Sequence, residues 1–183
     1  MTSERAITDV FAWQALDSRG TPTVAAEITL AGGARGGSAI VPSGASTGTH
    51  EARELRDGGT RYGGRGVANA VANANEDLAS AILGLDASEQ SRVDESLRQA
   101  SGDDSLALLG ANAVLALSIA AAQAAAAAGG QPLYAAVARP GTRPLLPLPM
   151  VNIISGGRPR WPLNRCSGLP GGSPQRVQFL RSN

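Results

Sequence analysis

The stretch TVAAEITLAGGARGGSAIV, residues 23–41, contains the pattern that decides the fold. Between residues 23 and 30, apolar residues recur at every second position, which is the period of a strand with one buried face. This apolar set is Val24, Ala26, Ile28 and Leu30. The sequence Ala31-Gly32-Gly33 then favours a turn, and residues 37–41 favour a further strand. We therefore expect two neighbouring strands joined by a short turn.

The rest of the chain adds a strand before this pair and helices after it. Residues 7–16 have a less regular strand pattern, and helical segments fit residues 67–83, 88–99 and 109–128. The last helix ends before Gly129-Gly130, which is typical of a helix stop. Because the strands precede the helices instead of alternating with them, the order indicates an α+β fold.

Residues 38–57, SAIVPSGASTGTHEARELRD, join the last expected strand to a hydroxyl-rich loop and then to a charged segment. Side-chain oxygens are available at Ser43, Ser46 and Thr47, and Gly44 and Gly48 bracket them with backbone freedom. Such a loop can swing over a bound ligand. On spacing alone, an ordinary surface turn is the commoner explanation of these residues.

Several motifs that occur in one order around this loop resemble a known family. DSRGTPTV precedes the loop at residues 17–24, LGANA follows it at 109–113, and PLPMVNIISGG ends the series at 147–157. This ordered set resembles the enolases, the phosphopyruvate hydratases of glycolysis, over nearly all of residues 6–157. The resemblance implies an enolase N-terminal-like domain, in which a three-stranded antiparallel meander is followed by helices. The C-terminal (β/α) barrel of such proteins is absent from this sequence.

The composition changes after Gly157. Residues 158–183 contain five arginines and no acidic residue, whereas residues 1–157 contain eleven arginines and all fifteen acidic residues. We expect a capping domain over 1–139, a linker with the first barrel strand over 140–157, and a basic tail over 158–183. Read one nucleotide later, the codons of the tail can encode enolase-like residues, which favours a frameshifted or truncated gene. The alternative is a genuine short, disordered tail whose arginines bind nucleic acid or anionic surfaces nonspecifically.

The resemblance implies the Mg²⁺-dependent dehydration of 2-phosphoglycerate to phosphoenolpyruvate. In this superfamily a lysine or histidine base works with one or two Mg²⁺ ions, and in the enolases the base is a lysine. All sixteen residues counted as Lys or Arg in this chain are arginine. A guanidinium keeps its proton at neutral pH, because its pKa exceeds about 12. We therefore expect no catalytic residue in the chain and no hydratase activity from the chain alone.

By the same resemblance, the loop is the segment that contacts the substrate. Ser43, Gly44, Ala45, Ser46 and Thr47 match the residues that close over it, and Ser46 matches the serine whose oxygens reach the second Mg²⁺. Hydroxyl and carbonyl oxygens suit this hard cation. One neutral hydroxyl gives Mg²⁺ little reason to release its waters, so weak or no Mg²⁺ binding is expected from the chain alone.

Charged residues near the loop have both functional and structural explanations. Arg19 is either an active-site or subunit-facing charge, or the ion-pair partner of Asp17 or Glu54. The single histidine, His50, could act as a general base, although a structural role is favoured. Acidic and basic residues alternate after it, which is typical of a solvated face or a dimer edge. These residues are Glu51, Arg53, Glu54, Arg56 and Asp57.

Partners and location follow from composition and resemblance. Residues 1–9 show no secretory signal, so we expect a cytoplasmic protein. The apolar stretch 106–128 is mostly alanine and contains Asn112 and Ser118, which favours a buried helix over a membrane span. The intact family implies a homodimer, and no specific nucleic-acid partner is expected. Three functions stay open: an inactive capping domain, a subunit that pairs with a full-length enolase, and a nonspecific binder of anionic surfaces.

Overall fold

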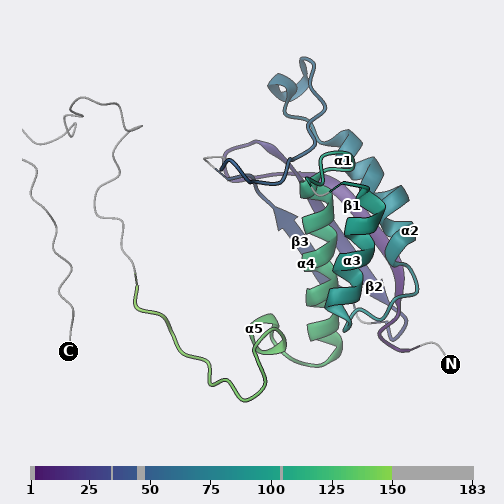
Figure 1. The fold of residues 1–183 in the computed structure, drawn as a ribbon, viewed down its shortest axis with the longest axis vertical. Helices are drawn as coiled ribbons and strands as arrows, with labels where there is room; N and C mark the ends of the chain where they lie inside the picture. The colour runs from purple at the N-terminus through teal and green to yellow at the C-terminus, as the bar shows by residue number, and fades with distance from the viewer. Residues whose placement is uncertain (1–2, 34, 45–47, 104, 150–183) are drawn as a thin grey trace, which may run out of the picture. The chain divides into compact units, whose positions relative to one another are not determined.

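Three antiparallel strands form one sheet in chain order in the computed structural model (Figure 1). They are β1 (Ile7–Leu16), β2 (Pro22–Leu30) and β3 (Arg35–Val41). The structure describes residues 3–33, 35–44, 48–103 and 105–149. The apolar positions expected from the alternation in β2, including Val24 and Ile28, are fully buried in the core. The expected antiparallel meander is confirmed.

The helices follow the sheet in the chain and cover one of its faces (Figure 1). The helix expected over 67–83 consists of α1 (Ala68–Asn73), a π-helical turn η2 (Ala74–Leu78) and α2 (Ala79–Ile82). The other two expected helices are α3 (Gln90–Ser101) and α4 (Ala111–Ala128), each beginning two residues later than expected. A 3₁₀ turn η1 (Arg61–Gly64) and a short helix α5 (Leu133–Ala136) lie outside the expected segments. The α+β class is confirmed.

Helix α4 packs against β2 and β3, and glycine makes the approach to β3 possible. A Cβ on Gly37 would lie 2.3 Å from the carbonyl oxygen of Ala120 and 2.6 Å from the Cβ of Ala124. Small side chains on both elements therefore bring the two backbones close together. By length and composition, α4 could cross a membrane. Half of its length is nevertheless buried inside this fold, as expected for a core helix.

The register of the strands separates two faces of the sheet. Ala12, Ala26 and Ala39 are cross-strand partners, and all three are buried beneath the helices. In the neighbouring row, Trp13 and Ile40 flank Ala25 on the opposite face, because side chains alternate along each strand. Phe11 stacks on Trp13 with ring centroids 5.6 Å apart. Phe11 and Ile40 are 58% and 57% exposed, so β1 and β3 offer apolar side chains to solvent on this second face. Thr23 and Ala25 of β2 are nevertheless buried there, so the expectation of a single buried face is wrong for the first half of this strand.

A side chain from η2 covers part of the free edge of β1. The Asn75 amide accepts a hydrogen bond from the backbone N–H of Ala12 at 2.7 Å and donates one to its carbonyl at 2.9 Å. These two bonds imitate a neighbouring strand. Asn75 therefore protects one point of an edge that would otherwise offer unpaired backbone groups to another chain.

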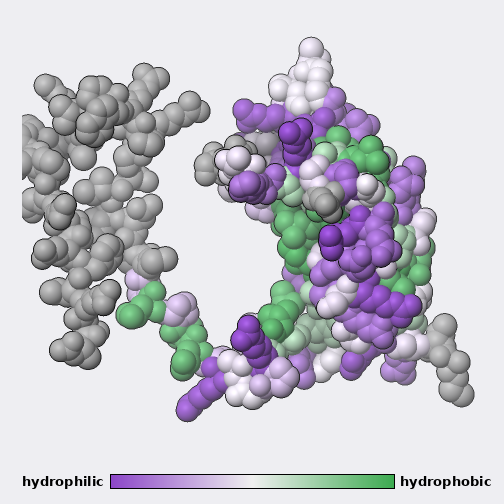
Figure 2. All heavy atoms as spheres, in the orientation of Figure 1, coloured by the Kyte–Doolittle hydropathy of each residue, from purple (hydrophilic) through white to green (hydrophobic). Residues whose placement is uncertain are grey.

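The chain divides into two units after Pro144. In the first unit, hydrophilic residues dominate the surface over α3 in the view of Figure 2. The described part of the second unit, residues 145–149, has no helix or strand. Its leucines are largely exposed, at 84% for Leu145, 99% for Leu146 and 91% for Leu148.

Candidate functional site

The loop predicted to close over substrate leaves the sheet after Val41, and Ser43 is held from three directions at that point. The guanidinium of Arg19 donates a hydrogen bond of 2.6 Å to the Ser43 carbonyl. The Ser43 hydroxyl donates to a carboxylate oxygen of Glu54 at 2.8 Å and accepts a bond from Arg56. Both oxygens of Ser43 therefore have partners within the domain.

Arg19 reaches Ser43 from a turn that Asp17 organises. One carboxylate oxygen of Asp17 accepts the backbone N–H groups of Arg19 and Thr21, both at 2.8 Å. The other forms an ion pair of 3.0 Å with the Arg19 guanidinium. The Thr21 N–H, helped by the bonds from Arg19, lowers the pKa of the Asp17 carboxyl. Of the two partners expected for Arg19, Asp17 is the one that forms the ion pair.

Arg56 connects the charged segment to three other parts of the domain. Its Nη1 donates to the carbonyls of Pro22 at 2.6 Å and Arg65 at 2.8 Å. Its Nε and Nη2 both donate to Glu54, and Nη2 also donates to the Ser43 hydroxyl. A planar guanidinium can serve these acceptors at once, because its donors point in fixed and different directions.

The neighbouring Asp57 binds the N-terminus of α1. Its two carboxylate oxygens accept the backbone N–H groups of Ala68 at 2.8 Å and Asn69 at 2.9 Å. These are donors that a helix leaves unpaired at its first turn. Arg56 and Asp57 thus have internal structural roles that the charge pattern did not indicate. Asp57 is nevertheless exposed, and the solvated face or dimer edge stays a prediction. Arg53 is exposed and still fits that prediction.

The LGAN sequence at residues 109–112 holds the charged segment in place. The side-chain amide of Asn112 accepts the N–H of Leu55 at 3.1 Å and donates to its carbonyl at 3.2 Å. Gly110 has φ +97°, and a Cβ there would lie 2.6 Å from the Asn112 oxygen and 2.7 Å from the Leu55 Cβ. The glycine is therefore required both by its backbone conformation and by the space. The role of Asn112 in binding Leu55 was not predicted from the sequence. The signal that could have indicated it is an asparagine at the start of a predicted helix.

Of the remaining predicted loop residues, the structure describes only Gly44. Gly44 is exposed next to Ser43. The predicted residues Ala45, Ser46 and Thr47 lie outside the described residues, so the assignment of Ser46 to Mg²⁺ stays a prediction. Beyond them, the backbone N–H of Gly48 donates to the Glu51 carboxylate at 2.7 Å. His50 is exposed.

The donor groups around Ser43 do not fit a resident Mg²⁺. The Ser43 carbonyl and hydroxyl both accept bonds from guanidinium groups, which carry the same sign of charge as the metal. Within the described ranges, no cluster of three or more His, Cys, Asp or Glu side chains could hold a metal ion. Mg²⁺ sites in proteins are built on carboxylates. No catalytic step through Mg²⁺ is therefore assigned to these residues.

Comparison with known proteins identifies the family of this domain. The family model described as "Enolase, N-terminal domain" matches residues 7–137. The chain belongs to the enolase N-terminal domain family. The meander, the residues that bind Ser43 and the Asn112 side chain that binds Leu55 all lie within the matched residues, so these contacts are part of this enolase domain.

Full-length enolases resemble the chain over most of its length. It is 57% identical over 152 residues to an enolase of Campylobacter jejuni subsp. doylei, which covers 83% of this chain. It is 56% identical over 151 residues to an enolase of Campylobacter jejuni subsp. jejuni serotype O:23/36, which covers 82% of this chain. The matched region spans 36% of each of these relatives.

Proposed function

We propose that this chain serves as the capping domain of an enolase, the enzyme that dehydrates 2-phosphoglycerate to phosphoenolpyruvate. The observation that supports this function is the anchoring of Ser43. Arg19, Glu54 and Arg56 hold it directly before residues 45–47, which the resemblance assigns to the substrate loop. A loop that closes over substrate needs a fixed point from which to move.

The chain alone is proposed to be inactive. Abstraction of a proton next to a carboxylate needs a base, and the superfamily uses lysine or histidine with Mg²⁺. The chain has no lysine, and its one histidine, His50, is exposed and makes no hydrogen bond among the described residues that could orient it. The base and the metal carboxylates would come from a barrel, and residues 140–157 would be the linker and first barrel strand after a capping domain of residues 1–139. Mg²⁺, a homodimer and a cytoplasmic location belong to the same proposal.

A chimera tests the proposal. Residues 6–157 would replace the matching residues of the Campylobacter jejuni subsp. doylei enolase, which is 57% identical over the matched region. Formation of phosphoenolpyruvate from 2-phosphoglycerate would then be followed with and without Mg²⁺. We expect an active, Mg²⁺-dependent chimera, and at least a tenfold loss of kcat/KM in its Ser46→Ala variant, which corresponds to about 1.4 kcal/mol of transition-state stabilisation.

The matched controls are the 183-residue chain alone and a Thr49→Ala chimera altered just beyond the loop. Turnover by the chain alone would contradict its inactivity. A folded chimera without turnover would contradict the capping function. Equal losses in the Ser46→Ala and Thr49→Ala chimeras would show that Ser46 has no special role.

A second function, pairing with a full-length enolase subunit, is favoured by the open face of the sheet. Phe11, Trp13 and Ile40 form an apolar surface there, and Phe11 and Ile40 are more than half exposed. If this face pairs, a Phe11→Asp variant should lose the association that the unaltered chain shows with the Campylobacter enolase in analytical ultracentrifugation. A monomeric unaltered chain that leaves the enolase unchanged would exclude this function.

A further inference from the structure

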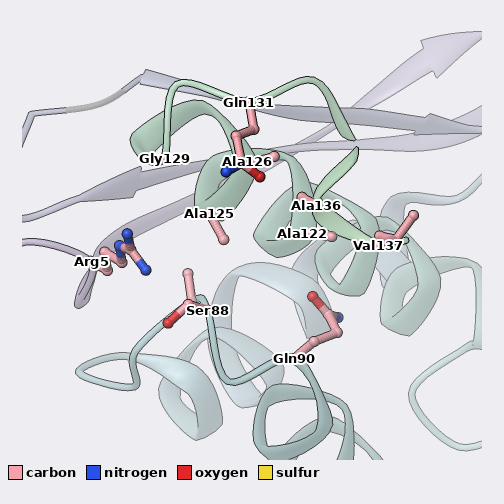
Figure 3. Close-up of a pocket in the computed structure, with 11 residues that line it drawn as sticks. Arg5, Ser88, Gln90, Ala122, Ala125, Ala126, Gly129, Gln131, Ala136 and Val137 are labelled. Atoms are coloured by element: carbon pink, nitrogen blue, oxygen red, sulfur yellow. The ribbon is translucent and has the colours of Figure 1, made fainter. Parts of the chain in front are cut away.

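Two regions of the domain lie outside the site around Ser43 and could receive a partner. One is the hollow beside the last turns of α4, which is lined chiefly by alanines, with Arg5 and Gln90 at its sides (Figure 3). The Gln90 side-chain oxygen has no hydrogen-bond partner among the described residues, but it is closed to solvent. A ligand in the hollow cannot reach that oxygen. The other region, the outer edge of β3, offers polar groups that a partner can reach.

β3 is the last strand of the sheet, and within the described chain it pairs with β2 alone. The outer edge of β1, by contrast, is closed at two places. Asn75 binds both backbone groups of Ala12, and Ile7 donates to the Leu85 carbonyl at 2.9 Å and accepts the Gly84 N–H at 2.8 Å. Proteins protect edge strands because unpaired backbone groups can pair with another chain. This domain protects one edge of its sheet and leaves the other available.

The register of the sheet shows which backbone groups of β3 face outward. Successive residues of a strand direct their N–H and C=O groups to opposite sides. The Asn75 bonds show that the groups of Ala12 point away from β2, so those of its partner Ala26 point toward β3. Ala26 pairs with Ala39, whose groups point back toward β2. The N–H and C=O groups of Ser38 and Ile40 therefore face the outer edge, and no described residue binds them.

The side chains of β3 favour an apolar strand as the partner. Residues 37–41, GSAIV, contain no charge and no proline, which are the devices that commonly block strand addition. Ile40 is 57% exposed, and Ser38 is exposed on the same face of the sheet. A strand added at this edge would place every second side chain on the face of Ile40. Apolar residues at those positions would cover it.

A second copy of this domain does not fit the edge. Helix α4 lies directly over β3, since a Cβ on Gly37 would lie 2.3 Å from the Ala120 carbonyl oxygen. Neighbouring strands are about 4.8 Å apart, whereas packed helices need about 8–10 Å between their axes. Two domains that paired through β3 would bring their α4 helices closer than helices can pack. A single extended segment carries no such helix.

We propose that the outer edge of β3 binds an extended segment of another protein, which adds to the sheet as a fourth, antiparallel strand. Its backbone exchanges hydrogen bonds with Ser38 and Ile40, and its alternate apolar side chains lie beside Ile40. The segment is recognised by its extended backbone and by its alternation of apolar residues. This edge is separate from the substrate loop, and the proposal does not depend on the proposed enolase function.

Binding would be measured on the 183-residue chain by NMR titration with the synthetic peptide acetyl-TVTVTVT-amide. In the free chain, the Ser38 and Ile40 amides should exchange with solvent at least about tenfold faster than the Ala39 amide. The peptide should bind with a dissociation constant of about 1 mM or lower and should slow both exchange rates. Two N-methylated peptides test the main-chain contact on the unaltered protein. Methylation of the three valines, whose N–H groups face β3 when their side chains lie beside Ile40, should weaken binding at least about fivefold, whereas methylation of the four threonines should not.

Two variants locate the edge on the protein. Ser38→Pro removes one outward N–H and keeps the bonds to β2, because proline is tolerated where the N–H of an edge strand faces solvent. It should weaken the peptide about fivefold or more, whereas Leu16→Pro, at an exposed position of β1, should not change its affinity. Circular dichroism would establish that both variants are folded. Absence of peptide binding, equal or reversed effects of the two methylated peptides, or equal effects of two folded proline variants would overturn the proposal.

Discussion

The side-chain amide of Asn112 pairs with both backbone polar groups of Leu55, as a neighbouring strand would. Asn112 is the second residue of the core helix α4 and is only 2% exposed, whereas Leu55 belongs to the charged segment after the loop. Two segments separated by 57 positions in the chain are thereby joined. The LGAN motif is thus a structural clamp in this domain, because its asparagine fixes Leu55 between Glu54 and Arg56.

Replacing Asn112 with alanine should destabilise the domain. Both hydrogen bonds to Leu55 would be lost and two backbone groups would lose their partners, so we expect a loss of about 2–4 kcal/mol in the free energy of unfolding. Urea denaturation at neutral pH would measure it. Asn69→Ala, at an exposed position of α1, is the matched control and should change stability by less than about 0.5 kcal/mol. Equal effects of the two variants would contradict the clamp.

Replacing Asn75 with alanine should open the edge of β1. Ala12 would lose the partner of both its backbone groups, so its amide should exchange with solvent faster and the unfolding free energy should fall by about 1–2 kcal/mol. Hydrogen exchange followed by NMR would report the Ala12 amide directly. Ser80→Ala on the same helical stretch, whose hydroxyl donates to the carbonyl of Glu76, serves as a local control. Unchanged exchange at Ala12 would show that the strand edge does not depend on Asn75.

Gly37→Ala should be among the most destabilising alanine substitutions in the sheet. The added Cβ would lie 2.3 Å from the Ala120 carbonyl oxygen, and backbone cannot yield there without moving α4 from β3. We expect a loss of about 2–3 kcal/mol or more. At Gly48, by contrast, an added Cβ meets nothing within 4 Å, and Gly48→Ala should leave the thermal midpoint nearly unchanged. A stable Gly37→Ala domain would mean that the helix and strand can separate at little cost.

Arg56→Lys keeps the charge but removes the fork of donors. A lysine ammonium cannot reach Glu54, the Pro22 carbonyl and the Arg65 carbonyl together, so we expect a loss of about 1.5–3 kcal/mol. Limited proteolysis should also show faster cleavage near Ser43, which would lose its bond from residue 56. Arg53→Lys, at an exposed position, is the control. If both variants resist unfolding and proteolysis equally, charge alone accounts for the role of Arg56.

Acid should weaken the domain partly through Asp86. Hydrogen bonds from the Ser88 hydroxyl, then the Ser88 N–H and the Ser3 hydroxyl, lower the pKa of this carboxyl from its ordinary value of 3.8. A carboxyl whose pKa is lower in the folded state stabilises that state above its unfolded pKa, and this contribution disappears as the pH falls through the folded value. Asp86→Asn should therefore reduce stability at neutral pH and flatten its decline below pH 3.8. Denaturation at a series of pH values would measure this.

The control for that series is Asp9→Asn. Asp9 is exposed on β1 and accepts no hydrogen bond within the described part of the chain. Its variant should keep the slope of the unaltered protein. A slope that is the same in the Asp86→Asn variant and the unaltered chain would remove Asp86 as a source of the acid sensitivity.

Much of the fold was predictable because its signals are local. The alternation of Val24, Ala26 and Ile28 indicates a half-buried strand wherever that strand lies, and Gly102 ends α3 in a left-handed conformation with φ +72°. The helix over 67–83 was predictable as well, but its π-helical turn was not. That turn brings Asn75 to Ala12, and neither residue signals the other, since 63 positions separate them.

The candidate site was only half predictable. Ser43 and the loop were found from hydroxyl and glycine spacing and from the resemblance to enolases. Two partners were open for Arg19, and the choice of Asp17 came from a turn whose backbone N–H groups already converge on that carboxylate. The roles of Arg56 and Asp57 were missed, because alternating charge is the same pattern on a solvated surface and on a segment bound to the domain.

From its sequence alone, this protein was determined to be an α+β chain with the ordered motifs of the enolase N-terminal domain and without a lysine to act as an enolase base. These properties depend on residue identity and on periods of two or about 3.6 residues, which neighbouring positions reveal. Only the tertiary structure decided which backbone groups Asn75 and Asn112 satisfy and which acceptors surround Arg56. Each of these depends on distances between segments far apart in the chain, and such distances are set by packing of the whole domain.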